Sequence, residues 1–428
     1  MQIKNITGTS RTLFILQVKL VVAWHYFLEL ISGKLRLGHY FRLLIRLNYF
    51  IGQLKENKFV KIGKNTRLNL YIPGFPSKAF FTACDKFKVF DEKFPNTTVL
   101  LSVTRACRYK CKHCYQMKDN GKDIDIDKFV AITQQLQNMG VAFFNIEGGE
   151  PFLVYDRLIK LCEAIDDRSE IWVNSTGDRM TLERLQELKK LNVTAIMFSL
   201  HTSEPEKLNQ FMGIESAWNT LEQAISNCHQ VGIAVSFNIC LQKEAFYNGE
   251  FENLMERAKD FGATIIQLIN PKPAGGWLES GVEQFSSKDL QRVKDLVHKY
   301  NHHKDFYNYP AISAQVNEED KTMFGCTAGG TDRFYINATG EVQPCEFLNI
   351  SFGNVNDEEF EEIYKRMRTT FEVPRDKWLC QEYSKEIFRL YQENDLDSLP
   401  LNKELSKEIY TNWNRGNDTD LYNRLNNK

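Results

Sequence analysis

The sequence has almost no excess of charge of either sign and little low-complexity sequence. Its 428 residues carry a formal net charge of −1, with 54 Lys and Arg against 55 Asp and Glu. Near-neutral charge argues against a protein that coats nucleic acid, and the scarcity of low-complexity sequence argues against a largely disordered chain. With 43% hydrophobic and 25% charged residues, the composition is that of a globular protein of about two to four domains, or of one large barrel with appendages.

Cysteine is also scarce, because ten residues in 428 are too few for a disulfide scaffold. The first residues lack the basic region, short apolar run and small-residue cleavage site of a signal peptide. We therefore expect a reducing, cytoplasmic setting, in which clustered thiols indicate metal binding or catalysis rather than crosslinks. Three of the ten cysteines crowd into eight residues, 107–114.

Residues 1–55 differ from the rest of the chain, because they carry eight basic residues against one acidic residue, a local net charge of +7. Polar residues interrupt an apolar run over 13–31, which is unfavourable in the middle of a membrane span, so we expect no transmembrane helix. A second run, 35–51, places arginines among apolar residues at helical spacing and predicts a basic amphipathic helix. Two interpretations stay open. In the first, the arm makes peripheral contact with an anionic membrane or captures an amphiphilic substrate. In the second, it is a helical pair packed on the main domain or on a second subunit.

From residue 97 onward, short β-rich runs alternate with helical patterns. The predicted strands are 97–102, 142–147, 170–175, 194–200, 233–240 and 264–269, and the helices between them include 126–139, 155–166, 181–191, 217–231 and 250–261. Near-continuous apolar strands joined by helices predict a parallel sheet covered on its faces. Six such units fit an α/β fold, a partial (β/α)6 TIM-like barrel, whose ligand site should lie at the C-terminal ends of the strands.

The strongest chemical signal follows the first predicted strand, where Cys107, Cys111 and Cys114 form a C-x3-C-x2-C run in a loop. Chance would produce this spacing only about 0.005 times in a chain with this cysteine content. Soft thiolates at close spacing bind iron–sulfur clusters or zinc. Three cysteines leave one iron of a four-iron cluster open to a ligand, whereas a structural zinc needs a fourth ligand, and His113 is poorly placed for it beside Cys114.

This loop resembles the signature of the radical S-adenosylmethionine (radical SAM) enzymes, three cysteines after the first strand of a partial barrel. A second family motif, GGEP, stands at Gly148, Gly149, Glu150 and Pro151, after the second predicted strand. The resemblance implies that a [4Fe–4S] cluster on the three cysteines binds S-adenosylmethionine (SAM), whose amino group GGEP receives. It further implies that the reduced cluster gives one electron to SAM, that the sulfonium bond breaks, and that a 5′-deoxyadenosyl radical abstracts hydrogen from a substrate.

Later strand ends match places where this family commonly contacts SAM. By that resemblance we expect ribose contacts from Asn174, Ser175 and Thr176, a carboxylate contact from Ser199, and ribose and adenine contacts from Asn238 and Ile269. The stretch after Ser199 lacks the arginine that many relatives have there. Lys207 is the candidate substitute for that arginine.

Beyond the barrel, Cys326 is followed by thirteen residues, Gly340, four residues and Cys345, with a predicted hairpin around Ala-Thr-Gly between them. This pattern resembles the SPASM auxiliary-cluster extension or its shorter form, the twitch domain. Only Cys380 follows, so we expect one auxiliary iron–sulfur cluster on Cys326, Cys345 and Cys380 rather than two. A degenerate extension that binds no metal stays open.

Together these patterns predict five parts: a basic amphipathic helical arm (1–55), a pre-barrel segment (56–96), a radical SAM core barrel (97–305), a SPASM/twitch-like extension (306–385) and a helical tail (386–428). Relatives with such extensions commonly modify ribosomally made peptides, so a peptide is the expected substrate. One alternative is a membrane-associated enzyme acting on a lipid, a tetrapyrrole or another hydrophobic metabolite, and another is a non-catalytic iron–sulfur or zinc protein. The resemblance also implies a low-potential electron donor of the flavodoxin or ferredoxin type, and we expect no nucleic-acid partner.

Overall fold

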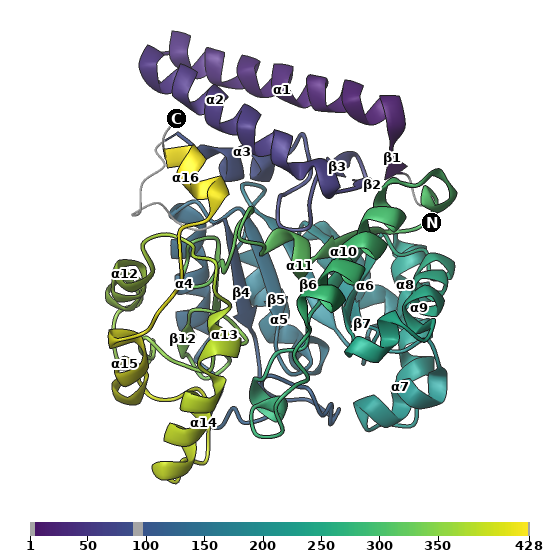
Figure 1. Ribbon diagram of the computed structural model, residues 1–428, viewed down its shortest axis with the longest axis vertical. Coiled ribbons are helices and arrows are strands. Elements are labelled where there is room, and N and C mark those ends of the chain that lie inside the picture. The colour runs from purple at the N-terminus through teal and green to yellow at the C-terminus, as the bar shows by residue number, and fades with distance from the viewer. Residues whose placement is uncertain (1–4, 89–96, 427–428) are drawn as a thin grey trace.

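The computed structural model describes residues 5–88 and 97–426 and has a nine-stranded sheet at its centre (Figure 1). The strands are β4 (Thr98–Ser102), β5 (Phe143–Glu147), β6 (Glu170–Ser175), β7 (Val193–Ser199), β8 (Ala234–Cys240), β9 (Ile265–Ile269), β10 (Ala311–Ala314), β11 (Arg333–Ile336) and β12 (Val342–Gln343). Their order is β10-β9-β8-β7-β6-β5-β4-β11-β12, and every neighbouring pair is parallel except β11 with β12. The sheet is therefore open, with β10 and β12 at its edges.

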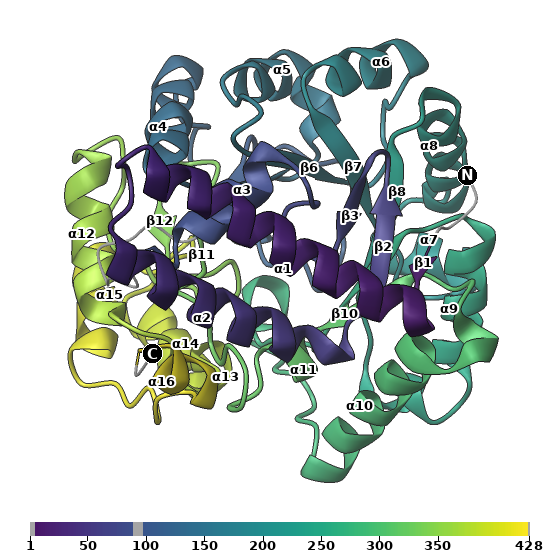
Figure 2. The same cartoon turned by 90° about the horizontal axis from the view of Figure 1, so that it is seen from above.

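Helices cover the outer side of this curved sheet (Figure 2). They are α4 (Ile126–Asn138), α5 (Tyr155–Glu163), α6 (Leu182–Lys190), α7 (Pro205–Met212), α8 (Ala217–Val231), α9 (Glu250–Asp260) and α10 (Ser287–His302). Side-chain caps and left-handed glycines set their limits: Asp125 accepts two backbone N–H bonds at the start of α4, and Gly232 ends α8. The predicted α/β fold with a partial (β/α)6 barrel is confirmed.

Three further strands, β10, β11 and β12, extend the sheet beyond the six predicted ones. Strand β10 adds to β9, and β11 pairs in parallel with β4, so the first strand of the barrel is an interior strand. The predicted hairpin is formed by β11 and β12. Because β10 begins at Ala311, the sheet continues past residue 305, where the barrel was predicted to end.

The segment before the barrel closes the N-terminal end of the strands. It contains β2 (Phe59–Ile62), β3 (Asn65–Arg67) and α3 (Lys78–Asp85), and β1 (Asn5–Ile6) pairs with β2. The buried Arg67 forms an ion pair with Glu170 at the start of β6, and its guanidinium lies 4.4 Å from the Trp172 ring centroid. Glu170 also accepts hydrogen bonds from the Gly74 N–H and from Trp172 Nε1, both at 2.9 Å. The segment is thus locked into the barrel by a buried, fully hydrogen-bonded carboxylate.

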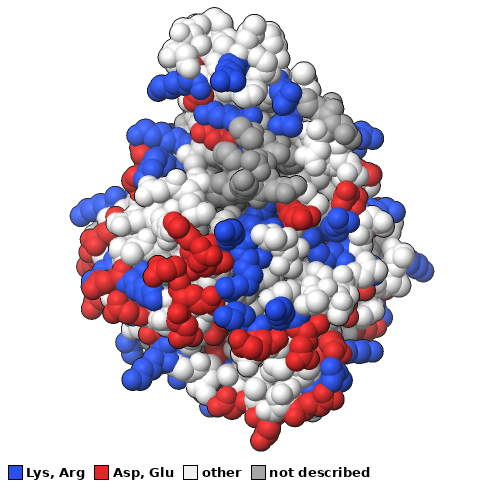
Figure 3. Space-filling model, turned by 90° about the vertical axis from the view of Figure 1, so that its left-hand side faces the viewer, with Lys and Arg blue, Asp and Glu red and all other residues white. Residues whose placement is uncertain are grey.

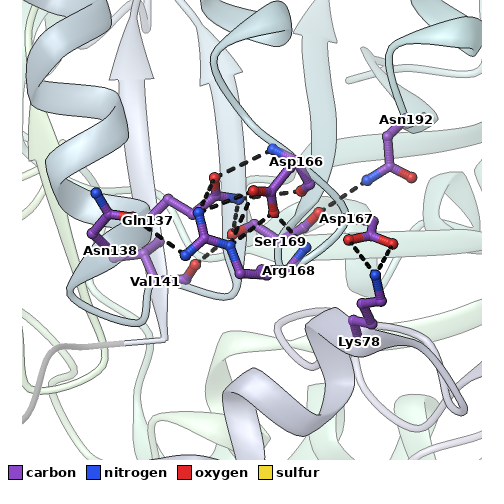
Figure 4. Close-up of polar contacts among 9 residues, drawn as sticks. All are labelled: Lys78, Gln137, Asn138, Val141, Asp166, Asp167, Arg168, Ser169 and Asn192. Carbon is purple, nitrogen blue, oxygen red and sulfur yellow. Dashed lines mark hydrogen bonds and ion pairs between the residues drawn. The ribbon is translucent and has the colours of Figure 1, made fainter.

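The turn between α5 and β6 lies at the same end of the barrel (Figure 4). Arg168 donates to Asp166 at 3.0 Å and to Asn138 at 3.2 Å, and Ser169 Oγ donates to the Val141 carbonyl at 2.7 Å. Lys78 of α3 lies 2.7 Å from Asp167, but both of these side chains are more than 60% exposed. Exposed pairs of this kind contribute little to stability, so the buried Arg67 pair is the stronger link between the segment and the barrel.

The arm is a helical hairpin of α1 (Gly8–Ile31) and α2 (Leu37–Gln53) that lies across this N-terminal end (Figures 1 and 2). The extension and tail add α11 (Gln315–Glu318), α12 (Phe360–Phe371), α13 (Leu379–Glu382), α14 (Ser384–Glu393), α15 (Lys403–Thr411) and α16 (Asp420–Asn426). Helix α16 returns to the arm, where Arg46 Nε donates to the Leu425 carbonyl at 3.0 Å. The division of the chain into five parts stays a prediction, and its residues 1–4, 89–96 and 427–428 lie outside the described residues.

The buried ion pair leads to a stability prediction. Arg67→Met should lower the free energy of unfolding by about 3–5 kcal/mol, because Glu170 is then buried without its cation. The matched variant Lys78→Met removes only the exposed pair with Asp167 and should change the free energy by less than about 1 kcal/mol. Urea unfolding followed by circular dichroism measures both values, and equal effects would contradict the role given to the buried pair.

Candidate active site

The three clustered cysteines lie in the loop after β4, at the C-terminal end of the sheet. Cys107 is exposed and Cys111 and Cys114 are half-buried, and the Cys114 N–H donates to the Cys111 carbonyl at 3.1 Å. Burial, with a contribution from neighbouring thiols, raises the pKa of Cys111 and of Cys114 to about 12. An iron centre would reverse this tendency, since a bound cation favours the thiolate forms. The donor set therefore fits a soft metal cluster.

A pair of glycines in the loop after β9 packs against the cysteine loop. A Cβ atom added at Gly275 would lie 2.4 Å from the Cys114 carbonyl oxygen, and one at Gly276 would lie 2.3 Å from the Lys112 carbonyl oxygen. The Gly276 N–H donates to the Cys114 carbonyl at 3.0 Å. Sequence analysis did not include these glycines, although a Gly-Gly pair soon after a predicted strand was the available signal.

Aromatic rings surround the middle of the cysteine loop. The His113 ring centroid lies 4.5 Å from that of His201, 4.7 Å from that of Phe211 and 5.5 Å from that of Trp277. Burial lowers the pKa of His113 to about 4, and burial together with His113 lowers that of His201. Both histidines are therefore neutral at pH 7. The four half-buried rings form an aromatic wall on this side of the loop.

The GGEP segment supports the cysteine loop from the other side. The Gly149 N–H donates to the Thr104 carbonyl at 2.7 Å, and the Glu150 N–H donates to the Ala106 carbonyl at 2.8 Å. A Cβ atom at Gly149 would lie 2.3 Å from the Ala106 carbonyl oxygen, and one at Gly148 would lie 2.6 Å from that of Thr104. The two glycines thus let the end of β5 approach the base of the loop. Pro151 begins the short helical turn Pro151–Val154 that follows.

The carboxylate of Glu150 is fully buried and joins the end of β5 to the end of β6. It accepts hydrogen bonds from Ser175 Oγ at 2.8 Å, from the Thr176 N–H at 2.7 Å and from Thr176 Oγ1 at 2.5 Å. The Phe152 N–H donates to it as well, at 3.1 Å. Ser175 and Thr176, predicted to contact ribose, therefore hold Glu150 in this structure, and their contact with SAM stays a prediction.

A cavity lies inside the barrel. Asn174, Asn238 and Ile269 line it, together with Asn145 and Glu147. Within the described part of the chain, the Oδ1 atoms of all three asparagines are buried and have no hydrogen-bond partner. Unmet acceptors of this kind suit the hydroxyl and amino groups of a nucleoside, so the cavity fits the polar part of SAM.

Ser199 has a different position from these asparagines. It pairs in register with Asn238 across β7 and β8, but among the described residues it lies outside the lining of the cavity. Lys207, considered as a substitute for the family arginine, forms an exposed ion pair with Glu204 at 2.6 Å. The contact between Ser199 and the carboxylate of SAM stays a prediction.

Glu147 is a functional candidate that sequence analysis did not identify. It ends β5 directly before GGEP, faces the cavity, and accepts from Tyr115 Oη at 2.5 Å and from Asn174 Nδ2 at 2.9 Å. Burial raises the pKa of Glu147 to about 8. At neutral pH its carboxyl group is therefore mostly protonated and can release or receive a proton inside the cavity.

The structure brings the three cysteines of the extension together. Cys326 precedes β11, Cys345 follows β12, and Cys380 lies in α13. Burial raises the pKa of Cys380 to about 12 and that of Cys345 above its usual value; Cys326 adds to the rise at Cys380, and Cys380 adds to the rise at Cys345. The buried Arg333 places Nη2 3.8 Å from Cys345 Sγ. The thiols Cys84, Cys162 and Cys228 are buried elsewhere in the core.

Two family models match the chain. Residues 101–258 match the radical SAM superfamily, and residues 326–383 match SPASM, an iron–sulfur cluster-binding domain. The chain thus contains a radical SAM domain followed by a SPASM domain. These domains imply SAM, a [4Fe–4S] cluster and auxiliary iron–sulfur binding, as predicted. The two matches favour the catalytic prediction over a non-catalytic iron–sulfur or zinc protein.

Relatives of known function are distant. The AdoMet-dependent heme synthase of Nitratidesulfovibrio vulgaris is 22% identical over 285 residues, which cover 62% of this chain and 77% of that enzyme. The sporulation killing factor maturation protein SkfB of Bacillus subtilis is 22% identical over 272 residues, which cover 61% of this chain and 63% of that protein. Among solved structures, Streptococcus suis SuiB bound to its precursor peptide SuiA matches with a TM-score of 0.55 at 16% identity, over 69% of this chain and 71% of SuiB. The structural likeness shows a shared fold.

The raised pKa of Glu147 leads to a prediction about pH. The carboxyl group has a pKa of about 8 when folded and 4.5 as its ordinary value, so the unfolded chain loses this proton first as pH rises. The stability of the wild type relative to Glu147→Gln should therefore fall between about pH 4.5 and pH 8, by a total of about 3–5 kcal/mol. Urea unfolding of both proteins at pH 5 and pH 8 tests this, and an equal difference at the two pH values would contradict it.

Proposed function

We propose that Cys107, Cys111 and Cys114 hold the [4Fe–4S] cluster of this radical SAM enzyme. The proposal is supported by three thiols on one loop, by the glycine pairs that pack on both sides of that loop, and by the aromatic wall around His113. Cluster and SAM, when bound, supply a 5′-deoxyadenosyl radical that abstracts hydrogen from the substrate. The residues of this chain position the reactants and exclude water.

For SAM itself, we assign the ammonium group to the backbone carbonyls of GGEP. The carboxylate of Glu150 is already occupied by Ser175, Thr176 and Phe152, so it orients the segment rather than binding the ligand. Asn174 and Asn238 would receive hydroxyl groups of the ribose, and Ile269 would contact the adenine. Ser199 would contact the carboxylate of SAM.

We assign one auxiliary cluster to Cys326, Cys345 and Cys380. The proximity of the three thiols supports this assignment, because Cys326 adds to the raised pKa of Cys380 and Cys380 adds to that of Cys345. Arg333 beside Cys345 is itself paired with Glu319 and Glu346. The open fourth position can be filled by a ligand other than cysteine. A low-potential flavodoxin or ferredoxin would supply electrons to the enzyme.

The substrate we propose is a peptide, and the SPASM match over residues 326–383 carries this proposal, because relatives with such extensions commonly modify ribosomally made peptides. The sporulation killing factor maturation protein SkfB, among the relatives, agrees with a peptide substrate. The heme synthase among the relatives favours a tetrapyrrole as the second candidate.

Removing the three loop cysteines should abolish radical chemistry. The variant Cys107→Ala/Cys111→Ala/Cys114→Ala, reconstituted and reduced without oxygen, should form no 5′-deoxyadenosine from SAM. The control Cys162→Ala, which removes a buried thiol in α5, should form it at the wild-type rate. Chromatography of the nucleoside product measures both, and product from the triple variant would refute the ligand assignment.

The same triple variant reports on the auxiliary site. About four irons per chain should remain in it if Cys326, Cys345 and Cys380 hold a four-iron cluster. Additional replacement of these three cysteines by Ala should remove that iron, as measured by iron and sulfide analysis. An iron-free triple variant would instead favour a degenerate extension.

Substrate class is tested by anaerobic incubation of the reduced enzyme and SAM with cell extract. Mass spectrometry of peptide and small-molecule fractions should show a mass change in a peptide, and the triple cysteine variant should not produce it. A mass change confined to a tetrapyrrole or a lipid would overturn the peptide proposal while leaving the radical SAM chemistry intact.

A further inference from the structure

The α1–α2 hairpin presents an apolar face to solvent. Of the twelve large hydrophobic side chains that are exposed in the described chain, ten lie on this hairpin: Leu13, Leu16, Leu20, Trp24, Phe27, Leu28, Ile31, Leu37, Phe41 and Ile45. On both helices they recur every three or four residues, so on each helix they follow one side. Soluble monomers rarely expose contiguous apolar patches of this extent unless the patch binds something.

The other side of the hairpin is anchored to the protein. Val18, Val22 and Tyr26 of α1 are buried, and Tyr26 Oη donates to Asp85 of α3 at 2.8 Å. By length and composition, α1 is the one described helix that could cross a membrane, with 17% of its most apolar window buried. Its anchored side makes a spanning orientation incompatible with this fold. The exposed side remains available for a surface contact.

The charged side chains beside this apolar face indicate which kind of partner it binds. Glu29 is the one acidic residue of the hairpin, and its carboxylate pairs with Lys88 at 2.9 Å. Lys34, Arg36 and Arg42 are exposed, and Figure 3 shows Lys and Arg beside the apolar crest of the arm. An apolar stripe bordered by cations is the pattern of helices that lie in the interface of an anionic membrane. A second copy of the same face fits less well, because the face carries cations and its one acid, Glu29, is already paired with Lys88.

We propose that the α1–α2 hairpin docks the enzyme on an anionic lipid bilayer, with both helices parallel to the membrane plane. The ten apolar side chains enter the boundary between headgroups and acyl chains, and Lys34, Arg36 and Arg42 meet the lipid phosphates. The cysteine loop and GGEP follow the C-terminal ends of their strands, whereas the hairpin covers the N-terminal ends (Figure 1). Docking therefore turns the cofactor end away from the lipid. The membrane localises the enzyme without supplying its substrate.

Vesicle flotation of the full-length protein tests the docking. Vesicles of phosphatidylcholine with phosphatidylglycerol should bind the wild type at least tenfold more tightly than phosphatidylcholine alone, and about 0.5 M NaCl should weaken the binding. Leu16→Ser/Leu20→Ser/Trp24→Ser should lower binding at least tenfold. Tyr247→Ser, which removes an exposed aromatic residue outside the arm, should bind like the wild type. All variants should form 5′-deoxyadenosine in solution at the wild-type rate, which separates failure of docking from failure of the proposed chemistry.

Three outcomes would overturn the proposal. One is the absence of binding to anionic vesicles, and another is equal binding by the wild type and the triple serine variant. The third is a dimer in sedimentation velocity that the serine variant converts to a monomer, which would assign the face to a second copy. A further variant, Lys34→Gln/Arg36→Gln/Arg42→Gln, should lose the preference for phosphatidylglycerol while keeping the apolar face, and an unchanged preference would contradict the role given to the cations.

Discussion

The close packing of the cysteine loop between two glycine pairs is the constraint on which the active site depends. Cys107, Cys111 and Cys114 lie in a loop without regular secondary structure, so contacts from neighbouring loops determine where their sulfur atoms lie. Gly149 approaches the Ala106 carbonyl on one side, and Gly276 approaches the Lys112 carbonyl on the other. Any side chain at either glycine would meet backbone, which cannot move aside as a flexible side chain can. The loops after β5 and β9 thus set the position of the loop after β4.

Two buried glutamates near the end of β5, Glu147 and Glu150, differ in their hydrogen bonds and therefore in their roles. Glu150 accepts four hydrogen bonds, from Ser175, Phe152 and two atoms of Thr176, and it ties neighbouring strand ends together. Glu147 accepts hydrogen bonds from the side chains of Tyr115 and Asn174, faces the cavity, and has a pKa of about 8. The first glutamate therefore has a positioning role. The second faces the cavity with a proton that it can release or receive there.

Local patterns predicted the barrel well, since each of its first six strands is a near-continuous apolar run and each begins and ends within one residue of its predicted limits. The spacing of three cysteines likewise indicated the chemistry. Long-range pairing could not be predicted in this way. Strand β10 has four residues, AISA, too few to show periodicity, and β11 joins β4 from more than 200 residues away. The Arg67–Glu170 pair spans 103 residues, and neither residue stands in a recognisable motif.

The hydrogen bonds of Ser175 and Thr176 are also long-range contacts that sequence patterns could not predict. Their position after β6 predicted a ribose contact, but sequence spacing does not reveal that the Glu150 carboxylate ends beside them. Resemblance to a family motif predicts which segment contacts SAM. Whether a given side chain is free to make that contact depends on the hydrogen bonds that it already forms within the protein. Asn174 and Asn238 differ because their carbonyl oxygens in the cavity are unpaired within the described chain.

The two ends of the barrel differ in structure and in proposed role. The pre-barrel segment and the hairpin close the N-terminal end, so the proposed cofactor and substrate sites share the C-terminal end. The extension supplies part of the cavity wall through Glu346 and Phe347, and through Arg333, which pairs with Thr98 at the N-terminal end of the sheet. Cys345 adjoins Glu346 in the chain, which brings the proposed auxiliary site next to the cavity. A cluster at that position would adjoin the cavity wall, where it would carry electrons or tune the electrostatics of the site.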